Sequence, residues 1–363
     1  MDEARDIVKL ALPFTAGILS FSCLNPTLEH TYEAAFMSLI LLSFMTVALL
    51  LNHDRSAHAR NIKIIITGYL AGTFVYSTAH LCGLTQTEGR LFVDAASEAG
   101  CAMQQSIDSI AFRSDDTNAL IKALLTGNRQ DLSQETANNF RTSGAAHILA
   151  LSGLHLGIIY MIISKLTSLA GGHPKAASIR SAICITTCAA YSFATGAGAS
   201  ITRALIFIIT GEAARLLHRK SDLKTTMASS LMIHLTLIPT DISSIGFQLS
   251  YAAIAGIAWG FPWFMSIWPD DGDGIMKRIW ESAALSISCQ LTTGPIAWLY
   301  FETFPQYFIL TNLIALPLTS LIIPAALLTL LLDTMGICPQ LLIQGTEMLT
   351  EALCGALDII ASM

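Results

Sequence analysis

The sequence predicts an all-α fold, a polytopic membrane protein of about ten or eleven transmembrane or re-entrant helices with a short amphipathic helical outer segment. Two observations lead to this prediction. The chain of 363 residues is 53% hydrophobic and only 13% charged, whereas soluble domains carry about 25% charged residues. Its mean hydropathy is +0.58, and apolar runs close to the roughly 20 residues that a bilayer core requires recur from end to end.

Three apolar segments open the chain and form its first predicted part, residues 1–83. They occupy residues 7–24, 32–51 and 64–81, and each is long enough to cross a bilayer as a helix. A short charged opening leads directly into the first run, and no pattern of a cleaved signal peptide is visible. We therefore expect the first helix to stay in the membrane.

The second predicted part, residues 84–143, is the sizeable extramembrane segment of the chain. Apolar side chains recur with helical spacing at residues 91–111 and 117–125, and Asp115 or Asp116 is the expected N-cap of the second helix. We predict amphipathic helices on the outer face of the membrane. Cys82 and Cys101 would both lie on that oxidising side, so a disulfide is one interpretation and packing is the favoured one.

The remaining apolar segments form a membrane core over residues 144–335 and a C-terminal amphipathic or membrane helix over residues 336–363. Residues 196–200 interrupt one pair of segments, and prolines at 295, 317 and 324 lie inside others, as is typical of discontinuous helices that line a cavity. The segments are predicted at residues 145–163, 179–195, 201–217, 225–238, 245–268, 282–300, 308–332 and 341–360.

The distribution of lysine and arginine predicts the orientation in the membrane. Short cytoplasmic loops carry an excess of both residues. A cytoplasmic N-terminus places most of the 20 basic residues inside and leaves the short outer connections without any. The remaining basic residues fall mainly in the long outer segment, where this rule is weak.

The run from His147 to His155 is the first candidate functional site, because it places two histidines and Ser152 in an apolar segment. Ionisable residues at membrane depth are costly unless they face a cavity, a partner or a substrate. On one continuous helix, Gly144, His147, Ser152 and His155 would share a single polar face. Hydrogen bonds to neighbouring helices that only fix the packing are the alternative interpretation.

Enzymatic and metal-binding interpretations have less support. His147 and His155 are eight residues apart without an adjacent carboxylate, so we expect no metal site. The acidic loop 270–274 is out of register for a calcium-binding loop and is interpreted as solvated. A nucleophilic Ser152 lacks the Gly-x-Ser-x-Gly elbow, and His234 has no distinguishing neighbours, although an intramembrane serine hydrolase stays open as an alternative. No nucleotide-binding loop occurs in the sequence.

Further polar residues stand near the starts of later apolar segments. Arg203 follows the break at residues 196–200, where a permanent positive charge near a helix start favours phosphate or another anion. An equally supported alternative is that the Arg203 side chain extends to the membrane interface and keeps its charge in water. Gln248, Ser250 and Asn312 hold similar positions, and each is a candidate for lining a path or for joining two helices.

The run from Gly144 to Gly157 resembles the signature of the competence domain of the ComEC family of inner-membrane DNA-uptake channels. Further pieces resemble that family in the same order, so that the resemblance covers about residues 120–332. These pieces are residues 124–129, residues 200–204 with Arg203, Pro239 with residues 246–250, and Phe304-Pro305 with Asn312 and Pro317.

The resemblance implies an integral-membrane channel that passes single-stranded DNA into the cytoplasm during natural transformation. We expect it to act without enzymatic activity and without a cofactor. It also implies a multi-pass protein of the bacterial inner (plasma) membrane, and we expect its N-terminus in the cytoplasm. The translocation-path or substrate-binding residues that it implies are His147, Ser152, Gly153, His155, Arg203, Gln248, Ser250 and Asn312.

We expect a short form of that family, without its OB-fold and metallo-β-lactamase-like domains. Residues 83–143 are too short and too helical for the first, and no His-x-His-x-Asp-His cluster for the second occurs within the sequence.

The expected partners are single-stranded DNA and membrane lipid, and the acidic outer segment favours a separate DNA receptor. The sequence leaves open whether the chain works alone, forms a homo-oligomer, or needs a separate nuclease and an ATPase motor. Transport of another anionic substrate is the main alternative function.

Overall fold

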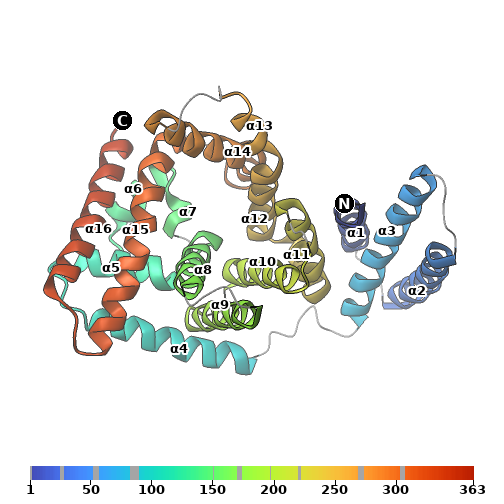
Figure 1. The fold of residues 1–363 in the computed structure, drawn as a ribbon, viewed down its shortest axis with the longest axis horizontal. Helices are drawn as coiled ribbons and strands as arrows, with labels where there is room; N and C mark the ends of the chain where they lie inside the picture. The colour runs from blue at the N-terminus through green and yellow to red at the C-terminus, as the bar shows by residue number, and fades with distance from the viewer. Residues whose placement is uncertain are drawn as a thin grey trace. The chain divides into compact units, whose positions relative to one another are not determined.

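The computed structural model describes residues 2–24, 28–51, 57–81, 90–149, 151–169, 174–196, 198–219, 222–268, 274–302 and 307–363. Every regular element within these ranges is helical, from α1 (Asp2–Leu24) to α16 (Gln340–Ala361), which confirms the predicted all-α class for the described residues (Figure 1).

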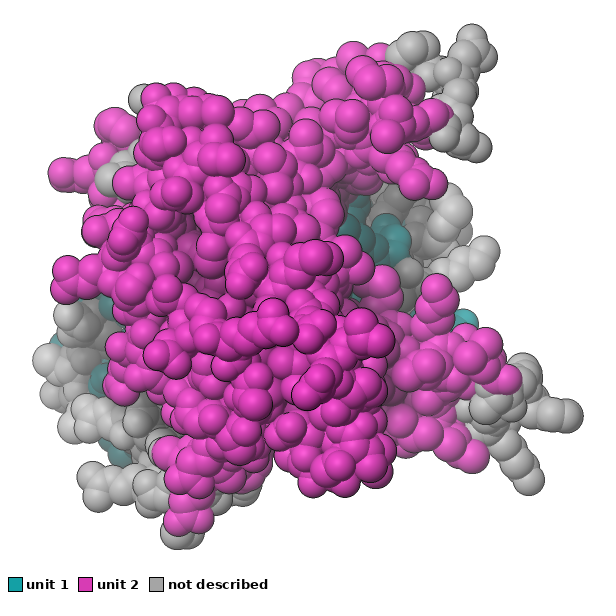
Figure 2. Space-filling view, turned by 90° about the vertical axis from the view of Figure 1, so that its left-hand side faces the viewer, with its two compact units in different colours: residues 1–90, 206–251 teal, residues 91–205, 252–363 magenta. Residues whose placement is uncertain are grey.

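Two compact units make up the chain, and each is described by itself. Unit 1 contains residues 1–90 and 206–251, and unit 2 contains residues 91–205 and 252–363 (Figure 2). Their boundaries pass through two helices, α10 (Ala199–Leu216) and α12 (Ile245–Ala255). Residues 223–243 pack on the N-terminal helices, and Phe247 and Tyr251 join a buried cluster with Phe14 and Ile18.

Unit 1 is built on a close crossing of α1 and α3 (Ala57–Leu81). A Cβ atom on Gly72 would overlap the carbonyl oxygen of Phe14, and one on Gly68 would lie 2.8 Å from the carbonyl oxygen of Leu10. The spacing of these two glycines, Gly-x-x-x-Gly, is the one that lets membrane helices approach backbone to backbone. The other helices of the unit are α2 (Leu28–Leu51), which packs on α3, α11 (Leu223–Leu237) and the 3-10 turn η1 (Pro239–Ser243).

Unit 2 is built around α5 (Asp115–Thr126) and α15 (Phe308–Thr334). Leu120 and Leu124 of α5 join one buried cluster with Ile322 of α15, and Ile121 joins a second cluster with Ile323. α16 runs beside α15 (Figure 1). The unit also contains α4 (Arg90–Asp108), α6 (Gln134–Thr142), α7 (Ala146–Leu149), α8 (Gly153–Ser168), α9 (Pro174–Ala194), the π-helical turn η2 (Gly256–Gly260), α13 (Phe261–Met265) and α14 (Ile275–Phe301).

The outer segment differs in detail from its prediction. The helices expected at 91–111 and 117–125 are present as α4 and α5, and α6 was not anticipated. α5 is buried along most of its length, so it is a core helix of unit 2 rather than a helix with one open face. Its N-cap position is Ser114, not Asp115 or Asp116, which lie inside its first turn.

The prolines do not divide their helices, contrary to the prediction. α14 continues through Pro295, and α15 continues through Pro317 and Pro324. A proline removes one backbone hydrogen bond, and packed neighbouring helices can stabilise the remaining turns on either side. The break expected at residues 196–200 is present, because α9 ends at Ala194 and α10 begins at Ala199, with Gly196 at φ +83° between them.

Three helices of the described residues are long and apolar enough to cross a membrane, at Asp6–Leu24, Arg60–Leu81 and Phe308–Thr334. α8 is a shorter apolar helix. The larger number of ten or eleven transmembrane or re-entrant helices remains a prediction.

Candidate functional site

The predicted helix 145–163 is two helices with a break between them. α7 ends at Leu149 and α8 begins at Gly153. Ser152 has an extended backbone, with φ −125° and ψ 169°, and its hydroxyl accepts a hydrogen bond from the backbone N–H of Leu154. Ser152 is therefore the N-cap of α8, and the polar face predicted on one continuous helix is wrong, because Gly144 at φ +86° also lies outside helical geometry.

His155 and Ser152 bond to each other across the first turn of α8. The Ser152 N–H donates to Nδ1 of His155 over 3.3 Å, and the Ser152 hydroxyl lies 3.1 Å from the same nitrogen. This is a capping box in which histidine takes the place of the usual Glu or Gln. A backbone N–H can only donate, so Nδ1 accepts, and a neutral His155 carries its proton on Nε2.

The Nε2 atom of His155 is the unsatisfied polar atom of this turn. The side chain is fully buried, at 0% exposure, and Nε2 has no hydrogen-bond partner among the described residues. A buried donor without an acceptor costs free energy unless a water molecule or a ligand meets it. His155 is therefore placed to donate a hydrogen bond to a polar group that enters beside α8.

His147 lies in a different environment. It is exposed on α7, and its Nδ1 is 3.0 Å from the carbonyl oxygen of Gly144. The two histidines of the signature are therefore separated by the break and do not act from one helical face.

Two other helices and the loop after α5 contribute contacts around the break. Nε of Arg129 donates to the carbonyl oxygen of Leu149 over 3.1 Å. Thr311 on α15 donates to the carbonyl oxygen of Ser143 over 2.6 Å, just before α7. Tyr191 on α9 bonds to the carbonyl oxygen of Leu125 over 2.8 Å, and thus fixes the last turn of α5 before Arg129.

Gly127 brings the end of α5 against this break. It is the C-cap of α5, with φ +78°. A Cβ atom at this position would lie 3.3 Å from the Cβ of Leu151. The segments that the sequence analysis singled out at 124–129 and 144–157 therefore form one local structure.

Two further predicted residues lie in unit 2 on neighbouring helices. A Cβ atom on Gly153 would lie 3.4 Å from Cβ of Ala204, so the start of α8 contacts the helix that carries Arg203. The Arg203 side chain is buried. Asn312 follows Thr311 on α15, and its Oδ1 is buried without a hydrogen-bond partner among the described residues.

Gln248 and Ser250 belong to unit 1 and are described there. The Gln248 amide donates to the carbonyl oxygen of Ile242 over 3.1 Å and so joins α12 to η1. Ser250 is half-buried on α12. Phe304 and Pro305 of the resemblance lie outside the described residues.

A pair of a buried histidine and a half-buried aspartate in unit 1 was not predicted from the sequence. Nε2 of His234 on α11 lies 2.8 Å from Oδ2 of Asp241 on η1. The rings of Phe247 and Tyr251 stand edge-on to His234, at centroid distances of 5.2 and 6.3 Å. The statement that His234 has no distinguishing neighbours is therefore wrong, and Asp241, seven residues further on across the turn at Pro239, was the available signal.

The described residues contain no cluster of three or more His, Cys, Asp or Glu side chains that could hold a metal ion. Most of the acidic loop 270–274, which resembles part of a calcium loop, lies outside them. Cys101 is an exposed free thiol, and Cys82 also lies outside the described residues.

Residues 124–363 match the sequence model of the family described as "Competence protein". The chain belongs to this family. The match begins at Leu124, at the segment that contacts the break in the signature, and extends through α16 to the end of the chain. The resemblance inferred from the motifs is thus confirmed, and it covers more of the C-terminal region than those motifs indicated.

Two curated relatives support membership of the competence family. The chain is 26% identical over 218 residues to ComE operon protein 3 of Bacillus subtilis (strain 168), which covers 60% of this chain and 27% of that protein. It is 26% identical over 243 residues to the uncharacterized protein YcaI of Escherichia coli (strain K12), which covers 64% of this chain and 31% of that protein. The chain therefore spans less than a third of the length of either relative. No solved structure matches it.

Proposed function

We propose that this competence-family protein conducts single-stranded DNA across the bacterial inner membrane into the cytoplasm during natural transformation. The observation that carries the proposal is the family match over residues 124–363. ComE operon protein 3 gives its support by name, since the chain is similar to it over 218 residues. In this proposal the protein crosses the membrane several times, has a cytoplasmic N-terminus, and acts as a conduit rather than as an enzyme.

The chemistry of the break in the signature supports this function. A phosphate that enters a low-dielectric region needs hydrogen-bond donors or cations around it. The start of α8 provides backbone N–H groups at the positive end of a helix. Beside it lies His155 with a buried Nε2 that lacks a partner among the described residues. We propose His147, Ser152, Gly153, His155, Arg203 and Asn312 of unit 2 as path residues, and Gln248 and Ser250 of unit 1 as further candidates.

A clean gene deletion tests the transport function. The deletion strain is expected to bind transforming DNA at its surface as the parent does, while labelled DNA in the cytoplasm falls to background. Complementation with the intact gene should restore uptake. Normal transformation by the deletion strain would refute the proposal.

Arg203 tests whether the path is anionic. Arg203→Glu is expected to reduce DNA uptake more strongly than Arg203→Lys, because a reversed charge repels phosphate and lysine retains the attraction. Arg203 is buried, so both variants need to be compared at equal membrane abundance and equal thermal stability. Equal uptake by the two variants would place Arg203 outside the path.

A serine hydrolase remains the second candidate function, because the Ser152 hydroxyl lies 3.1 Å from Nδ1 of His155. Activation of a serine requires a histidine that a third group orients. Labelling of the protein by a serine-directed phosphonate, abolished by Ser152→Ala, would favour this candidate over a conduit. A transporter of another anion would instead show uptake of that anion and none of DNA.

The proposed partners are single-stranded DNA and membrane lipid, with a separate receptor that delivers the strand. A separate nuclease, an ATPase motor and a second copy of the chain are further proposed partners, which co-purification with a tagged copy of the protein in the complemented strain can test.

A further inference from the structure

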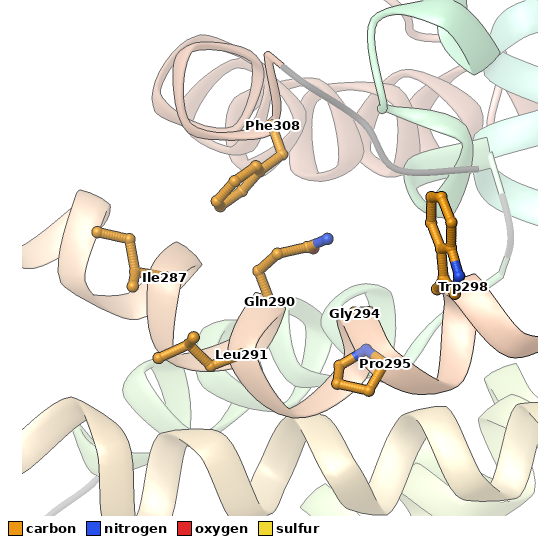
Figure 3. Close-up of a pocket in the computed structure, with 7 residues that line it drawn as sticks. All are labelled: Ile287, Gln290, Leu291, Gly294, Pro295, Trp298 and Phe308. Atoms are coloured by element: carbon orange, nitrogen blue, oxygen red, sulfur yellow. The ribbon is translucent and has the colours of Figure 1, made fainter. Parts of the chain in front are cut away.

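A pocket in unit 2 lies between α14 and the first turn of α15. Its volume is about 370 Å³, within the range of sites that bind small organic groups. Ile287 and Leu291 line one end of the pocket, and the aromatic side chains of Trp298 and Phe308 line the rest of it (Figure 3). The pocket is open on one side, so it can receive a group that remains attached to a longer molecule.

One polar side chain lies inside this apolar lining. Gln290 extends between Phe308 and Trp298 (Figure 3). Gln290 is half-buried, so its amide remains accessible from the pocket. An amide in apolar surroundings is costly unless a polar group meets it. A lipid acyl chain would leave the amide unsatisfied, so the lining favours an occupant that has both an apolar face and hydrogen-bonding atoms at its edge.

A nucleobase has this combination of properties. Its flat faces stack on aromatic side chains, and this stacking tolerates any sequence because every base has a π-face. Its edge carries donors and acceptors, and a glutamine amide supplies both. Trp298 and Phe308 provide the rings, and Gln290 provides the amide.

The pocket is connected to the break in the signature through α15. Phe308 lies one turn before Asn312, so the two side chains share a face of the helix. Between them, Thr311 donates its hydrogen bond to Ser143 at the start of the signature. A base held at Phe308 would therefore lie close along the helix to the unsatisfied Oδ1 of Asn312.

We propose that this pocket binds single nucleobases of a DNA strand, by stacking on Trp298 and Phe308 and by hydrogen bonding to Gln290. The inference rests on the proposed transport of single-stranded DNA. It adds a base-binding subsite to a proposed path whose other residues contact the phosphates. Because the amide can present either its oxygen or its nitrogen, the subsite binds bases without strong sequence preference.

Binding of two labelled strands to the purified full chain in detergent tests the subsite. One probe is a short oligo-dT, and the other is an abasic strand of the same length with the same phosphate backbone. Fluorescence anisotropy is expected to show that the protein binds oligo-dT at least about fivefold more tightly than the abasic strand, the low end of one base–aromatic stack. Gln290→Leu and Trp298→Leu should each reduce this ratio towards one while leaving the affinity for the abasic strand unchanged.

Two matched variants outside the pocket show whether losing any glutamine or any tryptophan changes the affinity ratio. Gln344→Leu on the exposed side of α16 and Trp263→Leu on α13 should keep the wild-type ratio. Gln290→Leu nearly preserves side-chain volume, so it remains informative if Trp298→Leu lowers the thermal stability.

Three results would overturn the base-binding subsite. These are equal affinity of the wild-type protein for both strands, an unchanged ratio in both pocket variants, and loss of co-purified phospholipid in the pocket variants with no change in the ratio. The last result would assign the pocket to lipid. None of them bears on the deletion experiment, so failure of the subsite and failure of DNA transport are separate outcomes.

Discussion

Ser152 and His155 satisfy each other's hydrogen bonds at the start of α8, and this reciprocity determines where the signature stops being one helix. Ser152 adopts extended backbone geometry, and its N–H donates to Nδ1 of His155. The histidine therefore has a fixed tautomer and a fixed ring orientation. Its buried Nε2 is held in one position, as a site that recognises a passing polar group requires.

Gly127 provides a test of the contact between α5 and the break. Gly127→Ala is expected to destabilise the protein by about 1–2 kcal/mol, because alanine is strained at positive φ. Its Cβ would also crowd Leu151. Gly157→Ala, in the interior of α8 with open space around the added carbon, should be neutral or stabilising by about 0.5–1 kcal/mol. Thermal unfolding in detergent measures both, and equal midpoints would contradict the role assigned to Gly127.

At the residue scale, the sequence identified which side chains are unusual but not how they are arranged. His155 is notable in an apolar run because a buried ionisable group is costly. Its partnership with Ser152 was not predicted, because a capping box is normally recognised by Glu or Gln at the third position. The pair of His234 and Asp241 depends on the turn at η1, which brings the two side chains to 2.8 Å, and helical periodicity contains no information about that turn.

Close glycine-mediated crossings recur at the scale of elements. In unit 1, Gly68 and Gly72 of α3 lie against the backbone of α1. In unit 2, Gly256 and Gly260 of the π-helical turn lie against Ser288 of α14. Both pairs have the Gly-x-x-x-Gly spacing, which allows weak Cα–H···O contacts between the two backbones. The crossings therefore depend on the absence of side chains.

Replacing one of these glycines should separate its two helices. Gly72→Ala is expected to lower the thermal midpoint strongly, with a loss of about 1–3 kcal/mol, because the added Cβ would overlap the carbonyl oxygen of Phe14 and backbone atoms cannot move aside cheaply. The matched control is Gly355→Ala on α16, which has open space around the added carbon and should not lower the midpoint. Similar losses in both variants would show that helix propensity, rather than the crossing, determines the result.

Most helices could be predicted from hydropathy, because long apolar runs leave few alternatives. The segments expected at 7–24, 179–195 and 308–332 agree with α1, α9 and α15 within several residues at each end. The division of the predicted helix 145–163 into α7 and α8 and the helix α6 were missed. The first is caused by a cap whose partner lies inside the apolar run, and α6 is largely polar apart from the buried Phe140.

Charged contacts connect several elements at the scale of the whole molecule. Lys122 of α5 lies 2.5 Å from Asp108 at the end of α4 and 2.7 Å from Asp131 in the loop that follows α5. The backbone N–H of Arg113 bonds to the buried carboxylate of Glu347 on α16. The pairs of Lys122 hold α4, α5 and the following loop together, and the contact of Arg113 with Glu347 joins this segment to α16.

The ion pairs of Lys122 predict a dependence of stability on pH. Burial acts to lower the pKa of Lys122, but the hydrogen bonds and charges of Asp108 and Asp131 outweigh it, and the net pKa is raised above 10.5. A raised pKa in the folded state contributes stability that is fully present below the unfolded value and is lost as the pH rises through the folded value. Lys122 lies outside the predicted membrane segments, so it responds to the bulk pH.

Comparison with Lys122→Met isolates this contribution. The difference in thermal midpoint between the wild type and this variant should be largest below pH 10.5 and should narrow at higher pH, where other titrating groups affect both proteins equally. A difference that stays constant across this range would contradict the assigned ion pairs.

The grouping of helices into units was the least predictable feature of the whole molecule. Linear reading of the sequence separates residues 1–83 from the later segments, whereas residues 206–251 pack with the N-terminal helices in unit 1. Such long-range pairings depend on side-chain complementarity between helices, and neither hydropathy nor charge patterning encodes it directly. Membership of the competence family was recognisable, because short motifs keep their order along the chain whatever the packing of the helices between them.

The hydrogen bond between Thr311 and Ser143 has a consequence for biosynthesis. It joins residues 168 positions apart, so this contact forms only after α15 has left the ribosome. Earlier helices insert and pack first, since long-range contacts form late. The proposed conduit would thus be completed late in synthesis.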